Sequence, residues 1–458
     1  MKTDTRVFAR RRRVPVLVLL MVLCGLPVWS RSSTAQVLPA AADNSEARKY
    51  LEDSILAPTS TVLDLSPRVL TLSDGAHRVK FEVQQSNDSY YLLFLNHNAN
   101  GPTNGTFDPY PVNGTGNYVI KRSLKDGSFE QIKIFLQDDP GFFVRVFPAG
   151  GPVFDPLHGG DSRCFIDVYI ADSRIYRNVV LPISFGQALT SSLQWLVQLT
   201  ADQIDWSSLF PPGDLAAYED VRYMVDEARK ALPTLPDADD GAMDKDGNLV
   251  FIASLKLQDD GPGFNCSGFA KWIADGLYKP ATGRFLTIDE LKKKHPELRG
   301  NRWSQPVEDT RDPYFGLDWT RNIAVALMEL DNPGRQLSPT AADVRDVPFS
   351  RYVENVGYPI AELKRVLYFL AVRDPGYFYF GSVNKEFGTA PVLRQHTHVV
   401  VLFPYFTQNG EFRVALLERN VESTLESLNR RYPDDFIHLV RARASSDYVP
   451  PVIHFAAR

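Results

Sequence analysis

The sequence has few cysteines and little net charge. It contains 3 cysteines and 8 histidines in 458 residues, and its net charge is −5. Three cysteines are too few for a scaffold built on disulfides. A nearly neutral chain gives no indication that nucleic acid or an anionic membrane is its main partner. Apolar residues make up 44% of the chain and charged residues 23%, which is typical of folded domains with sizeable cores.

The first 35 residues have the pattern of a secretory signal peptide. A basic run at residues 10–13 is followed by an apolar segment at 14–29 and by Ser33-Thr34-Ala35, which suits a cleavage site. The apolar segment is short for a membrane span and contains Gly25 and Pro27. We therefore expect an exported protein, periplasmic, cell-surface or secreted, without a stable membrane span after cleavage. A retained anchor is the alternative.

Four further segments differ in pattern. Residues 36–60 are small and polar, which is typical of a linker. Residues 61–185 alternate short strands with turns and predict a β-rich accessory domain, either a sandwich or a barrel. Residues 186–247 predict a helical connector that ends in an acidic linker, and residues 248–458 mix helices with strands. The expected fold class is therefore α+β.

The stretch from Gly261 to Tyr278 predicts a turn followed by a helix. Gly261, Pro262 and Gly263 favour a turn, and apolar residues at helical spacing follow at positions 269, 272, 273 and 277. The helix should begin near Cys266. Unpaired N–H groups and the helix dipole favour thiolate over thiol there, so Cys266 is a candidate nucleophile. A buried structural cysteine, or a bridge to Cys164, is the alternative.

A cysteine nucleophile requires a base, and two histidines are candidates. His398 opens the apolar strand 399–403, and His396 lies two residues earlier, where a regular strand would place it on the same side. A pair of histidines also suggests zinc. No further ligand stands at a suitable spacing, so we expect no metal and no other cofactor.

Hairpin geometry suggests a third group that could orient the base. If Gln408-Asn409-Gly410 forms a three-residue loop, Asn420 lies opposite His398 and Glu418 lies diagonally on the same face. A two-residue loop would instead turn both side chains to the other face. The sequence leaves Asn420 and Glu418 as alternatives.

Three motifs in this order resemble the NlpC-type cell-wall peptidases. Asn265-Cys266-Ser267-Gly268 is similar to the Asp-Cys-Ser-Gly signature of that family. Pro375-Gly376-Tyr377 and His398-Val399-Val400 correspond to its Pro-Gly-Asp and His-Val-Gly strands. The resemblance covers about residues 248–425. It departs from the family at Asn265, Tyr377 and Val400, where the family has Asp, Asp and Gly.

The resemblance implies a papain-like domain at 248–458 that hydrolyses peptide or amide bonds in peptidoglycan. Cys266 would attack the carbonyl, His398 would transfer the proton, and Asn420 or Glu418 would orient the imidazole. A domain that has lost catalysis and binds or scaffolds the wall is one alternative. A related amidase or transferase acting on protein or lipid is another.

Three residues near the thiol are expected to contact the substrate. Asn265 and Ser267 flank Cys266, and Gln258 could donate a hydrogen bond to the oxyanion together with the main-chain N–H of Cys266. The clusters at residues 309–314 and 318–321 could shape a groove.

Overall fold

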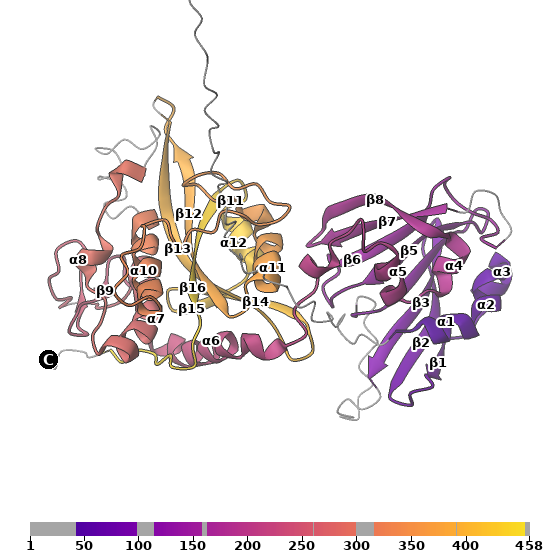
Figure 1. Cartoon of the computed structure of the whole chain (residues 1–458), viewed down its shortest axis with the longest axis horizontal. Helices are drawn as coiled ribbons and strands as arrows, with labels where there is room; N and C mark the ends of the chain where they lie inside the picture. Colours follow the sequence, from indigo (N-terminus) through magenta and orange to yellow (C-terminus); the bar gives the residue numbers. More distant parts are fainter. Residues whose placement is uncertain are drawn as a thin grey trace, which may run out of the picture. The chain divides into compact units, whose positions relative to one another are not determined.

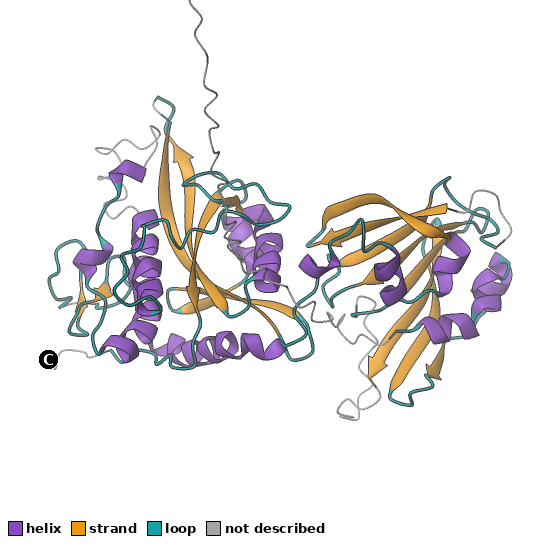
Figure 2. Ribbon diagram, in the orientation of Figure 1, coloured by secondary structure: helices purple, strands orange, loops and turns teal. Residues whose placement is uncertain are grey.

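The computed structural model describes residues 43–98, 114–157, 163–259, 261–298, 316–390 and 392–453. These residues combine helices with two large antiparallel sheets and one two-stranded sheet (Figures 1 and 2), so the α+β class is confirmed. No helix within these ranges is long and apolar enough to cross a membrane. The expected signal peptide and the cluster at 309–314 lie outside the described residues.

The first sheet has eight antiparallel strands in chain order. Its strands are β1 (Arg68–Thr71), β2 (His77–Gln85), β3 (Ser89–Asn98), β4 (Tyr118–Ser123), β5 (Phe129–Phe135), β6 (Phe143–Pro148), β7 (Arg163–Ile170) and β8 (Ser173–Ser184). Every strand pairs with the one before it, and among the described strands β1 and β8 do not pair. The expected sandwich or closed barrel is therefore wrong. Alternation shows which face of a strand is buried, but it does not tell one sheet from two.

The linker expected at residues 36–60 is also wrong over its described part. Residues from 45 onward form α1 (Ser45–Tyr50), α2 (Glu52–Leu56) and α3 (Thr59–Leu63). Ala47, Leu51 and Ile55 repeat every four residues and are buried in the core. A four-residue spacing of apolar residues is typical of a helix. The small and polar residues of the same segment suggested a linker instead.

Arg48 ties α1 to the helix that follows β8. Its side chain is 1% exposed and donates hydrogen bonds to the main-chain oxygens of Leu189 at 2.7 Å and Ser191 at 2.8 Å. Leu189 lies near the end of α4 (Phe185–Thr190). The guanidinium also lies over the ring of Tyr118, 3.7 Å from its centroid. One buried cation therefore satisfies the carbonyl groups at the end of a helix.

Helices α4, α5 (Leu193–Leu199) and α6 (Glu219–Ala231) confirm the helical part of the predicted connector. The acidic linker after it is wrong. Asp237 forms a parallel bridge with Phe264, and the carboxylate of Asp240 accepts the N–H of Ile252 at 3.1 Å. Since these residues bind the loop that precedes Cys266, they belong to the C-terminal part of the fold.

The second sheet has the order β11-β16-β12-β13-β14-β15. Its strands are β11 (Tyr358–Pro359), β12 (Tyr377–Phe387), β13 (Leu393–Phe406), β14 (Phe412–Glu418), β15 (Val421–Ser423) and β16 (Phe436–Arg443). The helices beside it are α7 (Cys266–Thr282), α8 (Ile288–Leu291), α10 (Gly316–Leu330), α11 (Leu363–Arg373) and α12 (Leu425–Arg431). The two short strands β9 (Ala242–Met243) and β10 (Leu249–Val250) form a separate hairpin.

Helices cover both faces of the second sheet. Val399 and Val401 share a core with α7 and α10, whereas Val400 and Leu402 share a core with α11. Figure 1 shows α7 and α10 on the side of the strands away from α11. A strand buried on both faces loses polar alternation, which explains the uninterrupted apolar run at 399–403.

The β13–β14 hairpin has the register that a three-residue loop predicts. Val401 pairs with Leu417, and Phe406 pairs with Phe412. The N–H of Thr407 bonds the oxygen of Glu411 at 2.9 Å, and Gly410 has a φ of +80°. Glycine adopts this left-handed conformation without steric cost. The turn sequence therefore determines which residues of β13 and β14 pair.

The buried cation Arg48 provides a test of the corrected N-terminal region. We expect Arg48→Ala to lower the free energy of unfolding by about 2–4 kcal/mol, because two buried carbonyl groups lose their donors. Lys49→Ala removes the same charge from the exposed neighbouring position and should change it by less than about 0.5 kcal/mol. Urea denaturation followed by circular dichroism measures both variants. Equal stability of the two would contradict this role of Arg48.

Candidate functional site

Cys266 is the first residue of α7, as the sequence predicts. The side chain of Asn265 caps the helix by accepting the N–H of Gly268 at 2.8 Å. Asn265 is thus occupied in fixing the helix start, and the expectation that it contacts substrate is not supported. The cap leaves the thiol at the positive end of a 17-residue helix.

Gln258 holds the loop in front of the thiol. Its Oε1 accepts the N–H of Gly263 at 2.8 Å, and its Nε2 donates to the main-chain oxygen of Asp240 at 2.5 Å. The residue is 8% exposed. The structure therefore uses this amide to position the loop, and its role as an oxyanion donor stays a prediction. Ser267 is half-buried in the first turn of α7 and stays a candidate for substrate contact.

A close backbone approach sets the position of the helix start. A Cβ at Gly268 would lie 1.8 Å from the main-chain oxygen of Gly241, nearer than any side chain allows. The main-chain oxygen of Ser267 also accepts the indole N–H of Trp319 at 3.0 Å. These contacts fix the first turn of α7 from two sides.

The imidazole of His398 lies between a thiol and a carboxylate. Its Nε2 is 2.6 Å from Oε2 of Glu418, and the thiol of Cys266 lies near enough to the ring for each group to shift the pKa of the other. The side chains of His398 and Glu418 are 12% and 6% exposed. The structure therefore brings together three of the four residues that the sequence proposed as catalytic.

The thiol reaches β13 at an open edge. Pairing between β13 and β14 ends at Val401 and Leu417. Val399 lies just beyond that point, and its main chain contributes to lowering the pKa of the Cys266 thiol. The end of β14 thus leaves room for the start of α7 beside His398.

The charges at the site favour an ionised thiol. Burial raises the pKa of Cys266, but the hydrogen bond from His398, its positive charge and that of Arg419 outweigh burial and lower the pKa below its usual value. Burial lowers the pKa of His398, but Cys266 and Glu418 raise it to about 9. Between these two pKa values the stable form is thiolate and imidazolium.

The carboxyl group of Glu418 is ionised at neutral pH and well below it. Burial raises the pKa of this carboxyl, but hydrogen bonds from His398 and Arg431 outweigh burial and lower it to about 2. The carboxylate can therefore stabilise the imidazolium without taking its proton.

Asn420 does not reach the histidine, which corrects one of the two alternatives for the third group. Arg419 has a φ of +51°, and Glu418 pairs with Val421. The chain thus reverses before Asn420 comes level with His398. Its amide donates to the main-chain oxygen of Leu235 at 3.2 Å instead. The register of the hairpin was predictable, whereas the tight reversal after Glu418 was not.

His396 lies on the opposite face of the strand from His398. Val383 pairs with His398 and Asn384 pairs with His396, so β13 carries one extra residue between the two histidines. This bulge breaks the two-residue period that predicted a shared face. His396 is 6% exposed, and burial together with nearby positive charge lowers its pKa far below the usual value. It is neither exposed to substrate nor basic enough to rival His398.

Three residues of the site carry no signal in the sequence. The ring of Tyr432 stacks on that of His398, with centroids 6.1 Å apart and planes 24° apart. Arg431 bonds Glu418, and Arg419 makes two bonds to Asp237 at 2.9 and 3.0 Å. Arg431 and Tyr432 follow the hairpin through a further strand and helix, so no spacing rule connects them to the thiol.

The cluster at 318–321 is interior and does not line a groove. Asp318 accepts the N–H of His295 at 3.0 Å, and Arg321 forms a buried ion pair with Asp343 at 2.7 Å. These contacts anchor α10. In the described part of the chain, no group of three or more His, Cys, Asp or Glu side chains could hold a metal ion.

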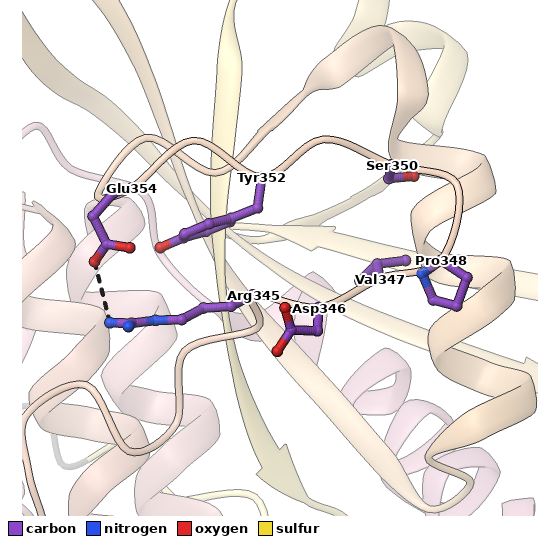
Figure 3. A pocket seen from close by; sticks show the side chains of 7 residues that line it. All are labelled: Arg345, Asp346, Val347, Pro348, Ser350, Tyr352 and Glu354. Carbon is purple, nitrogen blue, oxygen red and sulfur yellow. Dashed lines mark ion pairs between the residues drawn. The ribbon is translucent and has the colours of Figure 1, made fainter.

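A cavity of about 660 Å³ lies away from the thiol. Figure 3 shows the residues that line it, which are Arg345, Asp346, Val347, Pro348, Ser350, Tyr352 and Glu354. Arg345 pairs across it with Glu354 at 3.2 Å. None of these residues belongs to the Cys266–His398–Glu418 group.

Comparison with known proteins informs only the N-terminal half. A family described as a domain of unknown function (DUF8515) matches residues 38–208, which include the first sheet and its flanking helices. No curated protein and no solved structure matches the chain.

The ion pair predicts a measurable reactivity of Cys266. Glu418→Gln removes the charge that raises the pKa of His398, so the pKa of Cys266 should rise by about one unit and iodoacetamide alkylation at about pH 6 should slow by about tenfold. Peptide mass spectrometry after timed alkylation measures the rate. Glu426→Gln, in the exposed first turn of α12, is the matched control.

Cys164 serves as an internal reference in the same samples. Burial raises its pKa to about 12, so it should stay unlabelled. Alkylation of Cys266 in Glu418→Gln at the wild-type rate would show that the carboxylate does not support the ion pair.

Proposed function

We propose that the C-terminal part of this protein is a papain-like cysteine hydrolase that cleaves peptide or amide bonds. The observation that carries the proposal is the group of Cys266, His398 and Glu418, in which His398 bonds Glu418, the pKa of the thiol is lowered and that of the imidazole is raised. A structural cysteine needs neither a charged partner nor a helix N-terminus.

The proposed reaction follows from the positions of these groups. The thiolate of Cys266 attacks the carbonyl carbon, and the oxyanion is stabilised by the main-chain N–H of Cys266 and the dipole of α7. His398 gives its proton to the leaving nitrogen as the C–N bond breaks. It then takes a proton from water, which attacks the thioester and releases the acid and the thiolate. Glu418 keeps the imidazole oriented throughout.

The arrangement of elements supports a papain-like classification. A long helix that begins with the thiol packs against an antiparallel sheet, and the histidine lies on a later strand of that sheet. Glu418 comes from the strand next to His398. This order is the one that the resemblance to NlpC-type peptidases implies.

Peptidoglycan stem peptides are the proposed substrate. The support is the motif order at Cys266, Pro375 and His398, together with an N-terminal segment typical of export. An amidase would use the same three groups and the same acceptor, water, on a different C–N bond, whereas a transferase would pass the acyl group to another nucleophile. Mass spectrometry of the products separates these cases, because the fragment masses identify the cleaved bond and only hydrolysis adds one water across it.

Loss of catalysis is the competing reading, because three residues depart from the family motifs. The geometry argues against it. Asn265 still caps the helix, His398 still bonds Glu418, and Cys266 still acts to raise the pKa of His398.

Activity on purified peptidoglycan tests the proposal. We expect the wild-type protein to release soluble peptides, and Cys266→Ala and His398→Ala to lower the rate by more than about a thousandfold, as in other enzymes whose catalytic groups act as a unit. Cys164→Ala should keep the wild-type rate. Liquid chromatography with mass spectrometry quantifies the products. Equal turnover by wild type, Cys266→Ala and His398→Ala would remove the assignment.

A further inference from the structure

Glu418 uses its two oxygens for two different partners. Oε2 is 2.6 Å from Nε2 of His398, and Oε1 is 2.5 Å from Nη2 of Arg431. The carboxylate is almost fully buried, whereas the side chain of Arg431 is 42% exposed. A carboxylate held through one oxygen can still rotate about its last bond. Bonds to both oxygens fix the plane of the group.

Helix α12 positions Arg431. It is the last residue of α12, a short helix capped by the side chain of Thr424 and anchored by the fully buried Leu428. The next residue, Tyr432, stacks on the imidazole of His398. The end of α12 therefore contacts both the histidine and its carboxylate partner.

We propose that Arg431 is a positioning residue that orients Glu418 and thereby His398. The inference rests on the proposed function, since it assigns a role within the same group of residues. Arg431 acts on the thiol through its bond to Glu418 and through its charge, and it does not take part in proton transfer. The role requires a positive charge at this position and a donor aimed at Oε1.

The charges around Glu418 predict the direction in which a substitution of Arg431 shifts the pKa of Cys266. The charged and titratable groups around Glu418 are His398 on β13, Arg431 and Tyr432 at the end of α12, Cys266 at the start of α7 and Arg419 at the next position. Removing one positive charge from this group disfavours every anionic form in it. The thiolate of Cys266 should therefore form at higher pH when Arg431 is neutral.

The neighbouring Arg430 provides a matched control. It lies on the same helix, is exposed, and makes no hydrogen bond or ion pair that reaches Glu418, whose partners are His398 and Arg431. Arg430→Gln and Arg431→Gln remove the same charge from adjacent positions. Only the second removes a bond to the carboxylate.

The test is the pH dependence of Cys266 alkylation by iodoacetamide in the full-length protein. Arg431→Gln should move the acidic midpoint upward by about half to one pH unit relative to Arg430→Gln. Arg431→Lys keeps the charge, so its midpoint should stay near that of the wild type. Its turnover of peptidoglycan should still fall several-fold, because a lysine does not reproduce the reach and planar geometry of the guanidinium.

The outcomes separate this inference from the proposed function. A wild-type thiol that reacts only near the pH of an ordinary cysteine would overturn the proposed function and this inference together. A reactive wild-type thiol whose acidic midpoint is the same in Arg431→Gln and Arg430→Gln would overturn the role of Arg431 alone. Circular dichroism melting curves confirm folding, and Arg431→Lys gives a second variant if Arg431→Gln is unstable.

Discussion

The contact between the thiol of Cys266 and the imidazole of His398 depends on charge that the fold supplies around it. Both groups are largely withdrawn from water, and burial alone would keep each of them neutral. The start of α7 and the carboxylate of Glu418 reverse that tendency. One stabilises the anion and the other stabilises the cation. The fold therefore favours thiolate and imidazolium over the neutral pair.

Much of the surrounding structure serves to place these charges accurately. The cap from Asn265, the amide of Gln258 and the absence of a side chain at Gly268 fix the first turn of α7. On the other side, the end of β14 and the reversal at Arg419 open the edge of β13, where the thiol lies. Two segments far apart in the sequence thus meet at the thiol and the imidazole. A site built in this way tolerates little displacement, because proton transfer requires the two groups to come within hydrogen-bond reach.

The sequence alone predicted the parts of the site that depend on local patterns. The start of α7 followed from the turn at 261–263 and the apolar spacing after it. The register of the hairpin followed from Gly410, and with it Glu418 as one of two candidates. Two features depend on tertiary packing, namely the bulge that separates His396 from His398 and the stacking of Tyr432. No local pattern in the sequence predicts them. The linkers predicted at 36–60 and at 235–241 were wrong for the same reason. Polar or acidic composition suggested solvated segments there, although these residues contact distant parts of the chain.

A difference titration of thiolate absorbance near 240 nm tests the central claim most directly. The signal of the wild-type protein minus that of Cys266→Ser isolates one sulfur. We expect the thiolate of Cys266 to form below the usual pKa of a cysteine, about 8.5, and we expect this low-pH signal to disappear in His398→Ala. A single transition at or above about pH 8.5, unchanged by loss of His398, would contradict the ion pair and with it the proposed hydrolase.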